Sequence, residues 1–233
     1  MISIIVPVYN EEEMLPLFVE TFFKDIKLDE EYELIFVNDG STDNTLILIN
    51  QAMVNHSQIK LLSYESNMNL GYALPKGFRI AKGRIIVTMD SDLAHPPSLI
   101  PNLVKKIDQG FDVAIGSRYH KAAGVKGVPL HAHYLSKLVN NFTRIVLLTK
   151  IKDATSGFRA YKTEIIKIIN TKEKGFEVEL EIFVQLYNQK VKIAEVPFNS
   201  SDRSAGKSKV DLLKHGPRYI FSMIRIFCNR LFF

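Results

Sequence analysis

The sequence is short of cysteine and of long apolar runs, and it contains no internal repeat or low-complexity tract. Its single cysteine, Cys228, excludes an internal disulfide framework and suits a reducing compartment. No apolar stretch reaches the roughly 18–20 residues that a transmembrane helix needs. The opening MISIIVPVYN has no basic residues before its apolar run and soon stops at a proline, so we expect no signal peptide. We therefore expect a cytoplasmic protein without a membrane span.

The overall composition fits one α/β domain with a small extension. The chain has 233 residues, of which 46% are hydrophobic and 24% charged, enough to bury a sizeable core. A net charge of +5 is mild for a nucleic-acid binder. We therefore expect no nucleic acid as a partner, whereas phosphate ligands or an anionic membrane surface remain compatible with the charge.

Apolar runs typical of buried strands alternate with helical patterns through the first half of the chain. The expected strands are 2–8, 32–39, 59–64, 84–90 and 111–117. The expected helices are 15–26, 41–55, 72–83 and 97–110. This alternation predicts a Rossmann-like, mostly parallel sheet with helices on both faces.

Polar side chains follow four of the expected strands. They are Tyr9, Asn10 and Glu11 after the first, Asp39 after the second, Asp90 and Asp92 after the fourth, and Arg118 after the fifth. Ligands of such sheets bind at the carboxyl ends of the strands, so we expect these residues to meet in one crevice. The segment NDGSTDNT (38–45) is also typical of a simple turn and helix cap, and that alternative stays open.

The segment VTMDSDLAHPP (87–97) carries the strongest chemical signal. Asp90 and Asp92 lie one residue apart at the end of a buried strand, where desolvation and mutual repulsion are costly. A divalent cation that also binds a phosphate ligand would offset that cost. Hard oxygen ligands favour Mg²⁺ or Mn²⁺. The alternative is that one of the two aspartates caps the following helix.

Several motifs together resemble a known family. VPVYNEEE, VNDGSTDNT, DSDLAHPP and GSRY, in this order, resemble the GT-A fold glycosyltransferases of family two. DATSGFRAY (153–161), FEVELEI (176–182) and EVPFNSSDRSAGKSKV (195–210) are similar to the dolichyl-phosphate (polyprenyl-phosphate) mannosyltransferase branch.

The resemblance implies inverting transfer of a hexose, above all mannose from GDP-mannose, to a polyprenyl or dolichyl phosphate. UDP-glucose or UDP-GlcNAc donors are the alternative, as is a non-catalytic homologue that binds a nucleotide sugar.

The resemblance also implies a set of site residues. Donor-binding residues would be Pro7, Tyr9, Glu11, Val37, Asp39, Asp90, Ser91, Asp92, Arg203 and Lys209, with Asp90 and Asp92 as the metal ligands. The acceptor phosphate would meet Arg118, Ser136 and Lys137. Asp92, Arg118 and Arg203 would carry the catalysis, and Gly206 would let the loop of Arg203 and Lys209 open and close.

Two positions depart from the family pattern. Ala94 stands where the family often has a glutamine metal ligand, a gap that a water molecule or His95 could fill. Ala132 stands where an arginine for the acceptor phosphate is common, and the flanking His131, His133 and Lys137 could supply charge. Of these, Lys137 alone is reliably cationic at neutral pH.

The expected reaction needs no protein nucleophile, because a lipid phosphate is already anionic. The enzyme would hold the acceptor in line and neutralise the leaving diphosphate. Glu179 and Glu181 in FEVELEI could orient sugar hydroxyls or basic residues. The alternative, which we favour slightly from the sequence, is that they form the polar side of an amphipathic helix.

The C-terminal segment is basic, aromatic and apolar. Residues 201–233 contain seven Lys or Arg against two Asp, and 218–233 interleaves arginines with large apolar side chains. We expect a GT-A domain over 1–210 and an amphipathic helix within 211–233 that lies on the cytoplasmic face of a membrane or docks on a membrane protein. The alternative is a helix packed on the core.

Overall fold

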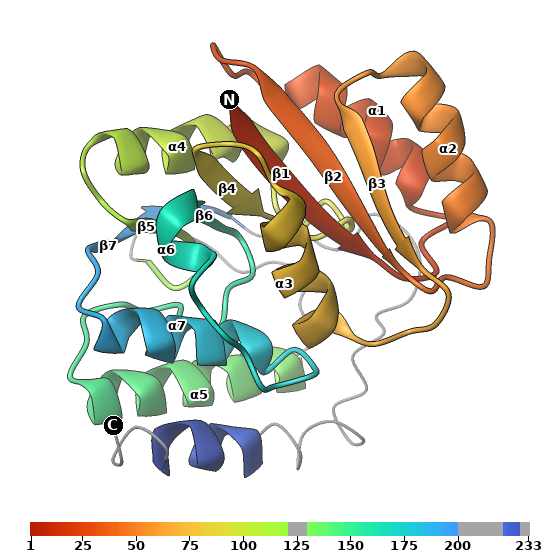
Figure 1. The fold of residues 1–233 in the computed structure, drawn as a ribbon. Helices are drawn as coiled ribbons and strands as arrows, with labels where there is room; N and C mark the ends of the chain where they lie inside the picture. The colour runs from red at the N-terminus through yellow and green to blue at the C-terminus, as the bar shows by residue number, and fades with distance from the viewer. Residues whose placement is uncertain (121–129, 200–220, 229–233) are drawn as a thin grey trace.

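The computed structural model describes residues 1–120, 130–199 and 221–228, without the side chains of 130–133. Seven strands form one sheet in the order β3-β2-β1-β4-β6-β5-β7 (Figure 1). The strands are β1 (Ile2–Val8), β2 (Tyr32–Asp39), β3 (Ile59–Tyr64), β4 (Ile85–Thr88), β5 (Val113–Ser117), β6 (Arg159–Lys162) and β7 (Ile193–Pro197). The helices are α1 (Leu15–Asp25), α2 (Thr45–Asn55), α3 (Leu70–Ile80), α4 (Ile100–Asp108), α5 (Leu130–Leu147), α6 (Thr163–Ile166) and α7 (Val178–Asn188). A 3₁₀ turn, Pro97–Leu99, precedes α4.

The sheet is parallel except at β6. β1 pairs in parallel with both β2 and β4, and β5 pairs in parallel with β7. β6 lies between β4 and β5 and runs antiparallel to both. The predicted mostly parallel sheet is confirmed. Because β6 is antiparallel, it begins at the edge of the sheet where the other strands end.

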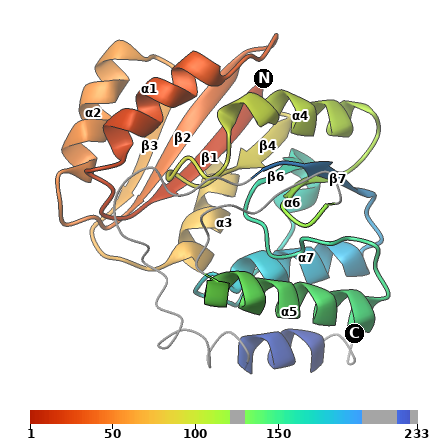
Figure 2. The ribbon, with the colours of Figure 1, turned by 180° about the vertical axis from the view of Figure 1, so that it is seen from behind.

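Helices cover both faces of the sheet, as predicted (Figures 1 and 2). One apolar core joins the sheet to α1, α2 and α4, with Phe18, Phe22 and Leu103 among its buried side chains. The second core joins the opposite face to α3, α6 and α7, with Phe78 and Phe183 among its members. Burial on both faces explains why β1 and β2 read as nearly continuous apolar runs.

Three helical segments are layered on this side of the sheet, and each contributes side chains to the second core. α7, α5 and the helical residues 221–228 lie one below another in both views (Figures 1 and 2). The Tyr187 hydroxyl donates to the Leu147 carbonyl at 2.8 Å, and the rings of Phe142 and Phe227 meet edge to face. Within the ranges that the structure describes, no helix is long and apolar enough to cross a membrane.

The loop before α2 shows why that helix begins later than the pattern predicted. The helix starts at Thr45 instead of residue 41 because the preceding residues bind the loop after β1. The Thr42 N–H donates to Asn10 Oδ1 at 2.7 Å, and the Glu12 N–H donates to Asp43 Oδ2 at 3.1 Å. Residues 41–44 therefore join two loops at the carboxyl edge instead of forming a first helical turn.

Candidate active site

The carboxyl edge of the sheet gathers the predicted polar residues. β1, β2, β4 and β5 all end there, and each is followed by one of the expected polar clusters. The loop 153–158 reaches the same edge because β6 runs in the opposite direction. The loop 153–158 therefore lies at the crevice, although the pattern of predicted strands did not indicate this.

Asp39 and its neighbouring loop close one end of the edge. Asp39 is buried, and its Oδ1 accepts a hydrogen bond from the Met68 N–H at 2.9 Å. Gly40 has a φ of +71°, and a Cβ at this position would lie 2.3 Å from the carbonyl carbon of Ser66. Both the left-handed backbone and the close approach require glycine. The tight turn fixes where the Asp39 carboxylate lies.

The loop after β1 is fixed by hydrogen bonds to the loop after β2. The Asn10 N–H donates to Ser41 Oγ at 2.9 Å, and the Glu11 N–H donates to Thr45 Oγ1 at 2.7 Å. Pro7 and Tyr9 are partly exposed beside this loop.

The expected donor residue Val37 is completely buried in the core against α3. A role for Val37 in donor binding is therefore restricted to its main chain.

Asp90 and Asp92 follow β4 at the centre of the edge. The Asp90 side chain is 56% exposed, whereas Ser91 between them is buried. Asp92 Oδ1 accepts a hydrogen bond from the Ala94 N–H at 3.0 Å, which holds the turn. The pair therefore presents carboxylate oxygens to the crevice from a short, fixed loop.

These residues fit a divalent metal that is shared with a phosphate ligand. In the described part of the chain, no third His, Cys, Asp or Glu joins Asp90 and Asp92 in a metal-binding group. Mg²⁺ commonly takes one or two protein carboxylates and completes its octahedron with phosphate oxygens and water. The donor set matches that pattern, not an all-protein cage.

His95 supports the carboxylate loop. Its Nδ1 accepts a hydrogen bond from the Asp90 N–H at 3.1 Å, which leaves the ring proton on Nε2. The ring stacks on Phe158 with centroids 4.9 Å apart and meets Phe198 edge to face. A ring held in this way does not offer Nδ1 to a metal. His95 therefore does not replace the missing glutamine through Nδ1 in this arrangement.

Arg118, after β5, is held by a buried carboxylate. Its N–H and Nε donate to Asp153 Oδ2, both at 2.9 Å, and its Nη2 donates to Asp153 Oδ1 at 2.8 Å. Burial alone would raise the pKa of Asp153, but Arg118 lowers this pKa below its ordinary value. Asp153 in turn raises the pKa of Arg118 against the opposing effect of burial. The pair is therefore ionised and the guanidinium is fixed.

A small polar network joins Arg118 to α5. Arg118 Nη2 also donates to Thr155 Oγ1 at 3.2 Å, and Thr155 Oγ1 lies 3.0 Å from Ser136 Oγ. Asn140 Nδ2 donates to Thr155 Oγ1 at 2.9 Å. Two of the expected acceptor residues, Arg118 and Ser136, thus lie together. The third, Lys137, is on the exposed surface of α5.

Sequence reasoning missed the residues that build this network. Asp153 and Thr155 lie in the motif DATSGFRAY, which served only for the family resemblance, and Asn140 gave no signal. The available clue was a cluster of polar residues immediately before the segment FRAY (158–161). That cluster lies at the carboxyl edge because β6 is antiparallel, which no local pattern indicates.

A buried pair, Arg159 and Glu179, lies behind the carboxylate loop. Arg159 is fully buried and donates from Nη1 to the Glu179 carbonyl at 3.0 Å and from Nη2 to the Ala154 carbonyl at 2.8 Å. Burial raises the pKa of Glu179 to about 7; Arg159 opposes this rise and Asp90 adds to it. Glu179 and Glu181 are each only 7% exposed. The interpretation of both as the solvated side of an amphipathic helix is therefore wrong.

Arg203, Lys209 and Gly206 lie outside the described residues, as do the side chains of His131, Ala132 and His133.

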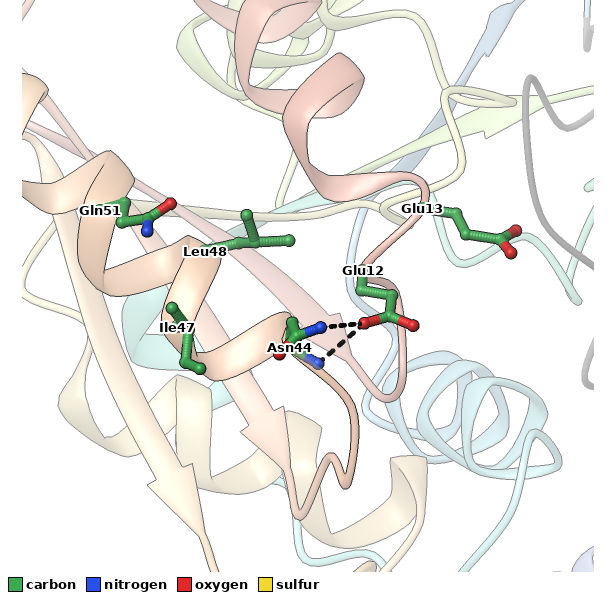
Figure 3. A pocket seen from close by; sticks show the side chains of 6 residues that line it. All are labelled: Glu12, Glu13, Asn44, Ile47, Leu48 and Gln51. Atoms are coloured by element: carbon green, nitrogen blue, oxygen red, sulfur yellow. Dashed lines mark hydrogen bonds between the residues drawn. The ribbon is translucent and has the colours of Figure 1, made fainter.

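An open hollow lies between the loop before α1 and α2 (Figure 3). Glu12 Oε2 accepts hydrogen bonds there from the N–H and Nδ2 of Asn44 at 3.0 and 2.8 Å. Its lining includes none of the expected donor or acceptor residues, and we assign it no role.

The fold and the paired carboxylates are typical of a class of enzymes, and comparison with known proteins identifies the family. The model of the family described as Glycosyl transferase family 2 matches residues 3–169. The chain belongs to glycosyl transferase family 2.

Among its relatives is a dolichol-phosphate mannosyltransferase of Pyrococcus furiosus, 35% identical over 90% of this chain. The chain spans 59% of that protein's length. A polyprenol monophosphomannose synthase of Mycolicibacterium smegmatis is 32% identical over 89% of this chain and 80% of its own length.

Solved structures show the same fold. Glucosyl-3-phosphoglycerate synthase from Mycobacterium tuberculosis, in complex with Mn²⁺, UDP and glucosyl-3-phosphoglycerate, superposes with a TM-score of 0.74. The comparison covers 98% of this chain and 80% of that one at 21% identity. The predicted GT-A fold is confirmed.

Proposed function

We propose that this protein transfers mannose from GDP-mannose to a polyprenyl phosphate, with inversion at the anomeric carbon. The names of the two relatives support the sugar and the acceptor class. The observation that carries the proposal is the Arg118 guanidinium group, whose orientation is fixed by hydrogen bonds. Asp153 and Thr155 bind its Nε and Nη2, whereas Nη1 makes no hydrogen bond within the described residues. An oriented guanidinium group with a donor to spare suits a phosphate monoester.

In this proposal the acceptor phosphate meets Arg118 and the Ser136 hydroxyl. Its oxygen is already anionic, so no side chain needs to remove a proton before attack. Arg118 offsets the repulsion between the acceptor phosphate and the donor diphosphate and orients the attacking oxygen. Lys137 would contribute long-range attraction from the exposed surface of α5.

The donor would bind across the other half of the edge. Asp39 would contact the base, with Pro7, Tyr9, Glu11 and the Val37 main chain completing the pocket. Asp90 and Asp92 would hold Mg²⁺ or Mn²⁺, which supplies charge stabilisation for the leaving diphosphate when bound. Structural neighbours were crystallised with these ions. Arg203 and Lys209 would neutralise the diphosphate further.

The test is a donor panel with purified protein. Polyprenyl phosphate is incubated with GDP-mannose, UDP-glucose or UDP-GlcNAc, each with Mg²⁺, Mn²⁺ or EDTA, and the lipid product is identified by mass spectrometry. We expect metal-dependent formation of a lipid-linked mannose. Turnover restricted to a UDP-sugar would replace the donor assignment, and binding without turnover for every donor would indicate a non-catalytic homologue.

We also propose that the protein works at an anionic membrane surface, through α5 and residues 221–228. Tyr134, Leu138 and Ile145 form an exposed apolar stripe along α5, and Ile145 is 73% exposed. Phe221, 68% exposed, and Ile224 extend the apolar surface on 221–228, which meets α5 through the Phe142–Phe227 contact.

Neither described helical segment contains an acidic residue, whereas Lys137 and Arg144 are exposed on α5. Arg225, on 221–228, is paired with Glu173. Ser136 is on the same helix, so this surface would bring the acceptor site to the lipid headgroups. The free Cys228 suits the reducing cytoplasmic side.

Two substitutions on this surface test the attachment. Ile145→Ser with Phe221→Ser should weaken binding to anionic vesicles by about 10-fold or more, because each large side chain contributes roughly 1.5–3 kcal/mol when fully buried. The matched control is Val54→Ser on α2, a position that is 84% exposed on another part of the molecule. Unchanged vesicle binding in the double variant would assign attachment to another surface or to a protein partner.

A further inference from the structure

Two carboxylates on α7 are equally buried but are bound differently. Glu181 accepts hydrogen bonds from the main-chain N–H groups of Lys172 and Glu173, with distances of 2.9 and 2.8 Å to its Oε2. Glu179 receives no such bonds: within the described residues, its Oε2 is buried without a hydrogen-bond partner. Glu181 thus has a structural explanation, whereas Glu179 lacks one.

The neighbouring Arg159 does not supply that explanation. Its two terminal nitrogens donate to the main-chain carbonyls of Glu179 and Ala154. The Glu179 carboxylate lies 3.3 Å from Arg159 Nη1, close enough for an ion pair but without hydrogen-bond geometry. A buried carboxylate that serves only to neutralise an arginine normally binds it through a hydrogen-bonded fork. Here the carboxylate keeps most of its capacity to accept hydrogen bonds.

Gly157 leaves space between Glu179 and the metal-binding loop. A Cβ at position 157 would lie 3.3 Å from Glu179 Oε1 and 3.8 Å from Asp90 Oδ1. The Thr88 hydroxyl donates to the Gly157 carbonyl at 2.7 Å, which fixes this backbone beside the end of β4. The missing side chain therefore keeps a gap between two carboxylates, one of which is an expected ligand of the donor's metal.

We infer that Glu179 binds a hydroxyl group of the donor sugar through this gap. The inference rests on the proposed function, since it assumes a sugar diphosphate held at Asp90 and Asp92. The transferred sugar lies next to that diphosphate by covalent connection. Sugar hydroxyls donate hydrogen bonds, and a carboxylate with open lone pairs accepts them. A site that pairs a buried acceptor with one hydroxyl also discriminates against sugars that lack it. Glu179 is thus a donor-specificity residue.

The test compares Glu179→Gln with Glu181→Gln. Calorimetry measures the Kd of GDP, of GDP-mannose, and of GDP-mannose analogues that each lack one hydroxyl, with Mg²⁺ present. For wild type, one analogue should bind about 10- to 100-fold more weakly than GDP-mannose, as expected for a hydrogen bond to a charged group. Glu179→Gln should weaken GDP-mannose by a similar factor, leave the GDP Kd within about 2-fold, and show little further loss with that analogue.

Glu181→Gln is the matched structural control. It should lower the Tm, because Glu181 binds main-chain N–H groups, while the ranking of the analogues stays that of wild type. If Glu179→Gln fails to fold, Glu179→Asp replaces it, since the shorter side chain keeps the charge but withdraws it from the gap.

Two results would overturn the inference. One is an analogue ranking in the folded Glu179 variant that is identical to wild type. The other is an equal loss of affinity for GDP and GDP-mannose. The proposed function fails differently: there, wild type forms no lipid-linked mannose, whatever the binding ratios show.

Discussion

The two halves of the carboxyl edge differ in how completely their charged groups are paired. On the proposed donor side, Asp90 is more than half exposed, and Asp92 accepts one main-chain hydrogen bond. On the proposed acceptor side, Arg118 has no such freedom, because the buried Asp153 binds it through three hydrogen bonds. The carboxylates are thus left for a ligand to complete, whereas the orientation of Arg118 is fixed by the protein itself.

In the proposed function, this difference follows from what each half would bind. A metal–diphosphate brings its own cation, so open carboxylate oxygens are what the protein must provide. A lone phosphate monoester brings no such partner and needs a cation already in position. The buried pair of Arg118 and Asp153 is costly to desolvate and is weak support for stability. We therefore interpret it as a device that orients Arg118.

The largest expected loss of activity comes from a substitution in the Asp90–Asp92 pair. Asp92→Ala should reduce transfer by about 10³-fold or more, because it removes one of two expected metal ligands and with it charge stabilisation of the leaving group. The fold should persist, since the carboxylate accepts only one hydrogen bond in a short turn. Initial rates with GDP-mannose and the Tm check both expectations.

Asp29→Ala, at an exposed surface position, serves as the control for this variant. Near-normal turnover of a stably folded Asp92→Ala protein would remove the metal site from this edge.

A smaller loss of activity is expected from a substitution in the Arg118–Asp153 pair. Asp153→Asn keeps the side-chain shape but removes the charge that holds Arg118, so kcat/KM for the acceptor should fall by about 100-fold while the donor KM changes little. The protein should also lose stability, because the Arg118 charge would remain partly buried without its partner.

Asp112→Asn is the matched control for Asp153→Asn. Asp112 lies just before β5, at the opposite end of the same strand from Arg118, and pairs with Lys162 at 2.8 Å. Its substitution should cost stability without a selective effect on the acceptor. An equal loss of acceptor kcat/KM in both variants would mean that Asp153 acts through stability alone.

The sequence allowed prediction of the donor half better than of the acceptor half. Asp39 and the Asp90–Asp92 pair follow apolar strands that run parallel to β1, so strand direction alone brings them together. The Arg118 network depends on β6, a strand of four residues whose antiparallel direction is set by long-range pairing with β4 and β5. Periodicity reports burial, but it carries no information on which end of a short strand faces the site.

The two glutamates of α7 illustrate the same limit. A Glu-x-Glu pattern near the start of a helix is typical of a solvated surface, and the first helical turn also favours acidic residues. Burial of Glu179 and Glu181 results from packing of α7 between the sheet and α5, which is a tertiary effect. The partner of Glu181 is a main-chain loop eight or nine residues earlier, which composition cannot reveal.

The dependence of stability on acid pH should reveal the Arg118–Asp153 ion pair. The pKa of Asp153 is lowered in the folded state, so its stabilising contribution is present above the unfolded value of about 3.9 and is lost as pH falls through the folded value. Wild type should therefore lose more free energy of unfolding than Asp153→Asn as the pH falls from about 5 to 2. Urea unfolding at several pH values measures the difference, and parallel curves would contradict the ionised pair.

The titration of Glu179 should change the free energy of unfolding in the opposite direction to that of Asp153. We expect this to be the smallest of the effects. Burial raises its pKa to about 7, so the folded state favours the protonated carboxyl. The stability of the protonated form is fully present below the unfolded pKa, about 4.3, and is lost as pH rises through 7. Relative to Glu179→Gln, wild type should lose up to roughly 3 kcal/mol of unfolding free energy between pH 4 and 8, at about 1.4 kcal/mol per pKa unit. Urea unfolding without metal or nucleotide gives that difference directly. If wild type and Glu179→Gln keep a constant difference across this range, folding does not raise the pKa of Glu179.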